Sequence, residues 1–123
     1  MPFIKRAWWE LLSFEYPLLR KDFSGIYERV RTTPLHSRRS PAPSPQQICL
    51  AVDAAAAFYF RKILCLQRSA ATACLLKKCG FAAQMVIGVQ LMPFLAHAWV
   101  ELDGLVINDK PYLAQIYSVL ARC

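Results

Sequence analysis

The sequence contains little charge and no organised set of cysteines. Only 19% of the 123 residues are charged, whereas 56% are hydrophobic, and this balance excludes a disordered chain. The five cysteines are odd in number and lack the regular spacing of a disulfide framework, which indicates reduced thiols and a cytoplasmic location. No internal repeat is visible. A chain of this length and composition is expected to form one hydrophobic core.

Hydrophobic segments typical of export or membrane insertion are also missing. At the N-terminus, Glu10 and Glu15 interrupt the sequence before an apolar export signal could form. Residues 79–100 carry no formal charge and are numerous enough to cross a bilayer. Gly88 and Pro93 divide this segment into pieces of strand length, so we expect buried strands and no membrane span.

Acidic residues are scarce, with eight Asp and Glu against fifteen Lys and Arg, and the net charge is +7. This charge would suit a nucleic acid, an anionic membrane surface or an acidic polypeptide. No nucleic-acid recognition motif accompanies it, and the aromatic residues are not interleaved with basic ones as a stacking platform requires. We therefore expect no nucleic-acid partner, although a non-catalytic basic binding module stays an alternative.

A segment rich in proline and serine, residues 36–47, divides the chain into two parts. We expect an N-terminal helical segment with this linker over residues 1–45 and a second domain over residues 46–123. In the first part, apolar residues recur at helical spacing and are interrupted by Pro17.

The N-terminal part is too short to bury much surface alone, so its helices must pack on the rest of the chain or on a partner. Ser24 is placed to cap a second short helix that reaches about Val30. Trp8 and Trp9 have two interpretations, because they could cover the hydrophobic core or form a docking surface.

Two helices are expected directly after the linker. Residues 46–60 have an apolar stripe at helical spacing, and residues 65–79 form a second helix rich in small side chains. Lys77 and Lys78 in its last turn and Gly80 after it mark the end of this second helix. The small side chains would let the helix pack closely against a sheet, as a central element.

Alternating apolar and polar residues then predict an antiparallel sheet. Residues 84–91 and 97–101 form two strands, and Asp103-Gly104 is a hairpin signal before a third strand over residues 105–109. Residues 112–122 are expected to form a closing helix. Helices followed by an antiparallel sheet indicate an α+β fold.

Three residues of this arrangement suit a thiol enzyme. Cys65 stands at a helix start, where backbone N–H groups and nearby cations such as Arg68 stabilise a thiolate. Cys65 by itself is better explained as a small buried hydrophobe, since a cysteine in an apolar stretch more often has that role. His97 and Asp109 follow on two neighbouring strands, an order that suits a nucleophile, a base and a carboxylate that orients the imidazole.

The hairpin between the second and third strands determines whether His97 and Asp109 can meet. A two-residue turn would direct the two side chains to opposite faces of the sheet. A three-residue loop over residues 102–104, with its glycine left-handed and bulged, pairs Glu101 with Leu105 and places His97 opposite Asp109. The catalytic hypothesis therefore predicts this loop. Glu101 itself is expected to lie toward the hairpin end, in solvent.

Several motifs follow one another in the second part of the chain: Cys65-Leu66-Gln67-Arg68-Ser69, Gly80-Phe81, Ile87-Gly88-Val89, His97-Ala98-Trp99-Val100-Glu101-Leu102-Asp103-Gly104 and Asn108-Asp109. With these motifs, residues 47–122 resemble the transglutaminase-like leader peptidases of lasso-peptide biosynthesis, which process microcin precursors. The N-terminal part resembles the same family only loosely.

The resemblance implies a papain- and transglutaminase-like cysteine protease core with Cys65 as nucleophile, His97 as base and Asp109 as orienting acid. The family cuts the leader from a ribosomally made precursor peptide, typically just after a threonine, and a separate ATP-dependent lasso cyclase then closes the core peptide. Fewer than fifty residues precede the protease region, too few for the recognition domain of some members. We therefore expect the split form, with a separate small precursor-recognition protein as partner.

Alternatives to this interpretation remain. The same three residues would suit acyl transfer to an amine, as in transglutaminases. A metal site at Cys74, Cys79 and His97 lacks the close paired spacing of zinc knuckles, so we expect neither a metal nor a cofactor. Tyr59 and Gln67 are guesses for the second oxyanion donor and are not counted among the site residues.

Overall fold

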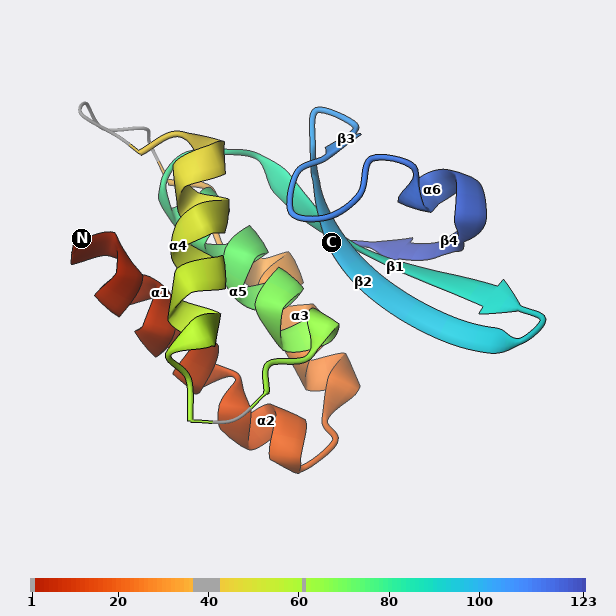
Figure 1. Cartoon of the computed structure of the whole chain (residues 1–123), viewed down its shortest axis with the longest axis horizontal. Coiled ribbons are helices and arrows are strands. Elements are labelled where there is room, and N and C mark those ends of the chain that lie inside the picture. The colour runs from red at the N-terminus through yellow and green to blue at the C-terminus, as the bar shows by residue number, and fades with distance from the viewer. Residues whose placement is uncertain (1, 37–42, 61) are drawn as a thin grey trace.

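The structure is a computed structural model and describes residues 2–36, 43–60 and 62–123 (Figure 1). Its elements are, in chain order, α1 (Pro2–Ser13), α2 (Glu15–Leu19), α3 (Phe23–Thr32), α4 (Pro45–Ala57), α5 (Cys65–Lys78), β1 (Ala83–Leu91), β2 (Phe94–Leu102), β3 (Leu105–Val106), α6 (Leu113–Ile116) and β4 (Ser118–Arg122). Helices followed by an antiparallel sheet confirm the predicted α+β class.

The N-terminal helices form where helical spacing predicted them, but their boundaries differ from the prediction. The break lies at Phe14, and Pro17 is the third residue of α2. Proline is tolerated there because N–H groups of a first helical turn have no partner within the helix. The cap of α3 is Asp22 and not Ser24, since the Asp22 carboxylate accepts a hydrogen bond from the Gly25 amide at 3.1 Å.

The two predicted central helices are present. Half of the predicted linker, residues 37–42, lies outside the described residues. A capping box at Ser44 and Gln47 starts α4, which ends at Ala57, three residues before the predicted end. Helix α5 begins at Cys65 as predicted, and Gly80 follows it with a φ of 91°. Glycine suits this position because side chains disfavour a left-handed backbone.

The four strands form one antiparallel sheet in the order β3-β2-β1-β4. Residues 112–122 do not form the predicted closing helix: α6 has four residues, and β4 then pairs with β1. The amide of Cys123 extends this pairing to the Met85 carbonyl at 2.9 Å. The otherwise open edge of β1 satisfies the backbone of β4, so tertiary pairing overrides the local helical pattern.

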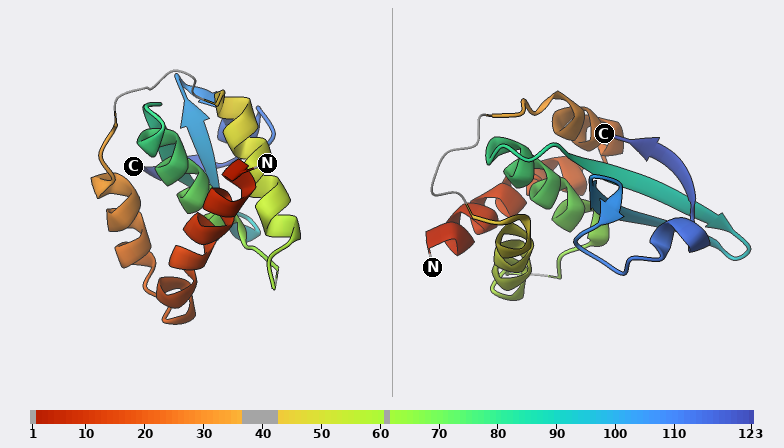
Figure 2. Two further views of the ribbon diagram at one scale, coloured as in Figure 1. Left: turned by 90° about the vertical axis from the view of Figure 1, so that its left-hand side faces the viewer. Right: turned by 90° about the horizontal axis from the view of Figure 1, so that it is seen from above.

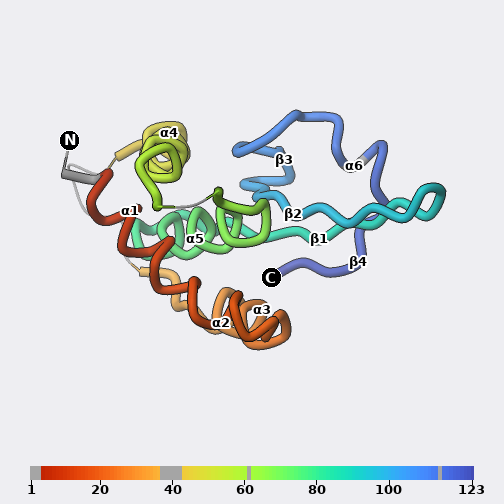
Figure 3. The backbone as a smooth tube through the Cα atoms, turned by 60° about the horizontal axis from the view of Figure 1, so that its bottom comes forward, coloured from red at the N-terminus to blue at the C-terminus, as the bar shows by residue number. Residues whose placement is uncertain are grey.

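Helix α5 lies between the sheet and the other helices (Figures 1 and 3). The larger hydrophobic cluster joins residues of α1, α4 and α5 to one face of the sheet, and the smaller one, around Val86, Trp99 and Leu113, covers the other face. Helices on both sides of the predicted boundary at residue 45 therefore contribute to the same core. The boundary itself stays a prediction.

The two N-terminal tryptophans differ in exposure. Trp8 packs partly buried against the larger cluster, with its ring 5.6 Å from that of Tyr59, whereas Trp9 is 64% exposed. Trp8 thus covers the core, and Trp9 stays available for a partner. Strands β1 and β2 contain the predicted strands 84–91 and 97–101, but β2 begins three residues earlier and residues 91–96 are exposed, so the expectation of buried strands is wrong there. No helix in the described ranges has the length and apolar character to cross a membrane.

Candidate active site

Cys65 is the first residue of α5 and is partly exposed. Leu64 before it supplies no side-chain cap, and the first turn holds no acidic residue. The uncapped N–H groups and the positive end of the helix dipole therefore act at the Cys65 thiol without a competing anion in that turn.

The other four cysteines differ from Cys65 in their surroundings. All five are free, and Cys49, Cys74 and Cys123 are buried. Burial raises the pKa of Cys49 to about 11, and burial likewise raises that of Cys123 to about 11. Burial also raises the pKa of Cys74 and Cys79. These thiols are held protonated at neutral pH, so none of them suits a nucleophile.

One turn after Cys65, Ser69 fastens α5 to the sheet. Its hydroxyl donates to the Ala98 carbonyl at 3.0 Å and accepts from the Asn108 amide at 3.2 Å. The C-terminal end of α5 lies near the start of β1, which pairs with the end of β2. Helix α5 therefore runs in the same direction as β2, and Cys65, one turn before Ser69, lies toward the His97 end of the strand.

His97 and Asp109 meet directly. The His97 Nε2 lies 2.8 Å from Asp109 Oδ2, and the backbone amide of Lys110 donates to Asp109 Oδ1 at 2.8 Å. Burial raises the pKa of Asp109, but these two hydrogen bonds and the nearby Arg68 charge outweigh it, so the pKa lies below its usual value. An ionised Asp109 holds the proton on Nε2 and leaves Nδ1 as the basic nitrogen.

The predicted hairpin loop is wrong, although the contact that it was meant to explain is present. Leu102 pairs with Leu105 across a two-residue turn, with φ values of 54° at Asp103 and 79° at Gly104. These left-handed conformations are typical of a tight hairpin turn. In unbroken register Asp109 would point away from His97.

The register is broken at Asn108. The amide of Ile107 still donates to the Val100 carbonyl at 3.0 Å, but the Val100 amide donates to the side chain of Asn108 at 2.7 Å. The side-chain oxygen replaces the carbonyl that a continued β3 would offer, and the chain leaves the sheet. This departure brings Asp109 to His97 and limits β3 to two residues.

Aromatic rings support His97 on the face of the sheet opposite α5. Its ring stacks on Tyr117 at 5.6 Å between centroids and on Trp99 at 6.1 Å. Gly88 pairs with His97 on β1, and a Cβ on Gly88 would lie 2.6 Å from the Trp99 ring and 2.8 Å from the Tyr117 Cβ. Only glycine leaves room for the ring that supports His97.

Arg68 joins the site to α4, a role that the sequence analysis missed. Its two terminal nitrogens lie 3.7 Å from Asp109 Oδ2 and 3.9 Å from Asp53 Oδ1. Arg68 and Ser69 follow Cys65 by three and four residues, so all three share one helical face. That spacing was the available signal for residues that contact the Asp109 segment.

Several other residues occupy different places from those expected. Glu101 is buried and not solvated, since it accepts a hydrogen bond from the Trp99 indole at 2.9 Å and lies 3.6 Å from Arg122. Tyr59 donates to Glu15 at 2.8 Å, and the Gln67 amide donates to the Leu11 carbonyl at 2.9 Å, so both guessed oxyanion donors are engaged in the helical core. The described residues hold no group of three or more His, Cys, Asp or Glu side chains suited to a metal.

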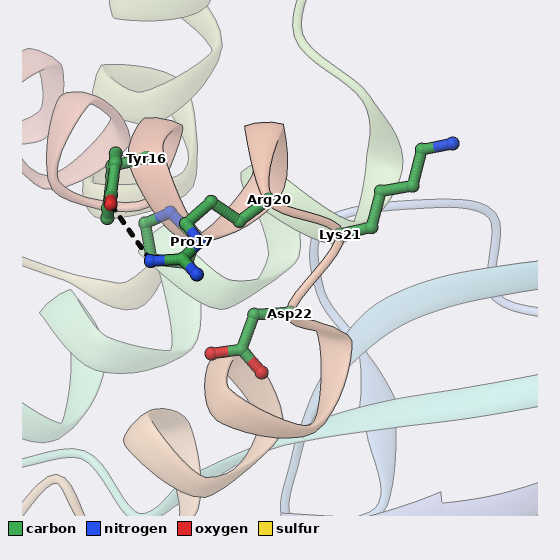
Figure 4. Close-up of a pocket in the computed structure, with 5 residues that line it drawn as sticks. All are labelled: Tyr16, Pro17, Arg20, Lys21 and Asp22. Atoms are coloured by element: carbon green, nitrogen blue, oxygen red, sulfur yellow. Dashed lines mark hydrogen bonds between the residues drawn. The ribbon is translucent and has the colours of Figure 1, made fainter.

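Two further features delimit the site. Among the described residues, hydrogen bonds and ion pairs bring together His97, Asp109 and Arg68, and none of them includes the Cys65 thiol. A surface pocket between α2 and α3 is lined by Tyr16, Pro17, Arg20, Lys21 and Asp22 (Figure 4). It shares no residue with the candidate site.

Comparisons with known proteins agree with this architecture. The family model described as transglutaminase-like superfamily matches residues 8–122. The chain is 44% identical over 58 residues to the microcin J25-processing protein McjB of Escherichia coli. The match covers 47% of this chain and 28% of that protein. No solved structure matches the chain significantly.

Proposed function

The chain belongs to the transglutaminase-like superfamily, and we propose that it is a cysteine peptidase that removes the leader from a lasso-peptide precursor. The observation that carries the proposal is the 2.8 Å pair of His97 and Asp109, which Arg68, three residues after Cys65 in α5, approaches at 3.7 Å. The similarity to a microcin-processing protein supports the substrate class.

The reaction begins with proton transfer from the Cys65 thiol to His97. The thiolate attacks the scissile carbonyl and forms a carbon–sulfur bond, while the carbonyl oxygen takes up the displaced electron pair. The His97 imidazolium then protonates the leaving amine as the carbon–nitrogen bond breaks. Asp109 stabilises the imidazolium and keeps its orientation through the Nε2 contact.

A water molecule completes the cycle. His97 takes its proton, the hydroxide attacks the thioester, and the carbon–sulfur bond breaks to release the leader and restore the thiolate. The backbone N–H of Cys65 is placed to stabilise the oxyanion because α5 has no side-chain cap. An amine in place of water would give acyl transfer, so the mass of the product separates the two reactions.

The proposed partners are the precursor peptide, a separate small precursor-recognition protein and the lasso cyclase that uses the released peptide. Trp9, which is 64% exposed, and the basic residues near it in α1 are the proposed docking surface for the recognition protein. We expect Trp9→Ala to weaken that complex in a pull-down or calorimetric titration. Tyr16→Ala, also exposed at 65%, serves as the control.

The decisive test is the intact mass of the cognate precursor after incubation with this chain and the recognition protein. Wild type is expected to release a fragment of leader mass, and Cys65→Ala is expected to release none. Cys79→Ala, at the residue that follows the last residue of α5, controls for the loss of a different thiol. Uncut precursor with wild type, when all proteins are folded and bound, would contradict the proposal and favour a basic binding module.

A further inference from the structure

The outer edge of β2 carries unpaired backbone groups beside His97. Val100 directs its N–H and C=O away from β1, because they bond Asn108 and Ile107. Backbone groups alternate along a strand, so those of Ala98 and Ala96 point to the same edge. The Ala98 carbonyl fits this alternation, since it accepts from Ser69 at 3.0 Å.

Pairing at this edge stops at Ala98. In the part of the chain that the structure describes, no hydrogen bond engages the Ala98 N–H or the N–H and C=O of Ala96. Strand β3 pairs only with Glu101 and Leu102, and the chain then leaves the sheet at Asn108. Ala98 itself is buried at 4% exposure, whereas residues 94–96 are exposed, so the accessible part of this edge is residues 94–96.

This edge also lacks the usual protection against a second chain. Native edge strands are commonly guarded by charged side chains, bulges or an internal proline. Residues 94–98 contain none of these, and Phe94 and Leu95 are 68% and 47% exposed. Figures 1 and 2 show the β1–β2 hairpin extending beyond the helices, and residues 91–96 around its turn are exposed. An unguarded edge of this kind suits a strand that binds during function.

We propose that the peptide substrate binds as an additional strand along β2, with its backbone paired to the N–H and C=O groups of Ala96. The inference rests on the proposed peptidase function. The substrate is the favoured occupant because the edge is continuous with His97, and α5 directs Cys65 toward the same end of β2. A peptide paired there delivers a carbonyl to the thiol in an extended conformation.

The two faces of the added strand would meet different surfaces. Leu95 lies on the same face as His97, two residues earlier, because side chains alternate along β2. Phe94 and Ala96 lie on the opposite face. A substrate side chain on the His97 face therefore contacts exposed Leu95, and an apolar residue at that position is preferred over a charged one.

Ala96→Pro tests the pairing, because proline removes one outward N–H and is tolerated where that group faces solvent. We expect the KM for precursor cleavage to rise about five- to tenfold, because one hydrogen bond is lost and the adjacent one is weakened. The kcat should change little. Ala96→Val keeps the N–H and is the matched control. Binding of precursor to Cys65→Ala, with and without Ala96→Pro, should show the same change in affinity.

A second measurement applies if Ala96→Pro does not fold. Precursors carrying a single N-methylated amide near the cleavage site remove one donor at a time. If the precursor binds as an added strand, N-methylation should slow cleavage at every second residue. Equal slowing at all positions, or no slowing at any, would overturn the inference. Failure of wild type to cleave any precursor would instead contradict the proposed function. Cleavage that is insensitive to both changes would leave the peptidase intact and the edge unused.

Discussion

The two faces of the sheet have different compositions and different tasks. The face toward α5 is apolar, with Met85 and Val100 fully buried in the cluster that joins the helices. The other face carries His97, Trp99 and Glu101, each with a polar or aromatic partner. Apolar packing on the first face stabilises the sheet. The stable sheet in turn holds the hydrogen-bonded groups of the second face in place. Substitutions on the two faces should therefore affect different measurements.

The largest expected effect is on catalysis. We predict that His97→Ala lowers kcat for precursor cleavage by about 10²–10⁴-fold, the usual contribution of a general acid–base. The thermal midpoint should change little, because His97 is partly exposed. His36→Ala, which removes the other histidine, is the control and should leave cleavage intact. A similar loss of kcat in His97→Ala and His36→Ala would show that cleavage does not depend specifically on the face of the sheet that carries His97.

Met85→Ala tests the apolar face. This side chain is fully buried, so its truncation should lower the free energy of unfolding by about 2–5 kcal/mol. Denaturant unfolding measures the change, and Gln84→Ala, at the exposed neighbouring position, should have almost no effect. The fraction that remains folded should cleave the precursor normally. Loss of activity without loss of stability would show that the two faces are not separable.

Gly88→Ala tests the contact beneath the aromatic support. The added methyl group would lie 2.6 Å from the Trp99 ring, so either the strand or the ring must move. We expect destabilisation of about 1–3 kcal/mol and a lower kcat, because displacement of Trp99 also releases the His97 ring. Near-ultraviolet circular dichroism should report the altered tryptophan environment. An unchanged spectrum with full activity would contradict this account.

The smallest effect concerns pH and Asp109. The pKa of Asp109 is lowered in the folded state, so around pH 4 the unfolded state binds more protons than the folded state. Ionised Asp109 therefore favours folding above about pH 4. The stability that wild type holds over Asp109→Asn should be present above about pH 4 and be lost as the pH falls through the lower folded pKa. Urea unfolding of both variants over this range measures it. A difference that grows toward acid pH would give the opposite sign.

The helices and the first two strands could be predicted from local patterns, because their signals lie within the elements. Helix α5 begins and ends almost as predicted, with Gly80 after it, and the alternation of β1 and β2 is correct. The predicted helix over residues 112–122 failed because pairing with β1 is a long-range interaction that local spacing does not contain.

In the candidate site too, local patterns predicted some features and long-range contacts determined the others. Cys65, His97 and Asp109 were selected from residue type and order, and the His97–Asp109 contact is present despite a wrong prediction of the hairpin. The role of Arg68 depends on Asp53 and Asp109, which lie far apart in the sequence. No local pattern predicts that the side chain of Asn108 replaces a backbone acceptor.

The sequence by itself determined the class of fold, the position of a cysteine at a helix start and the alternation that sets His97 on one face of β2. These follow from short-range rules of helix ends and strand alternation. Tertiary structure alone decided where β3 ends, how Asp109 reaches His97 and which edge of β2 stays open. Each of these depends on which distant group satisfies a backbone N–H or C=O, and that choice is made only when the chain is folded.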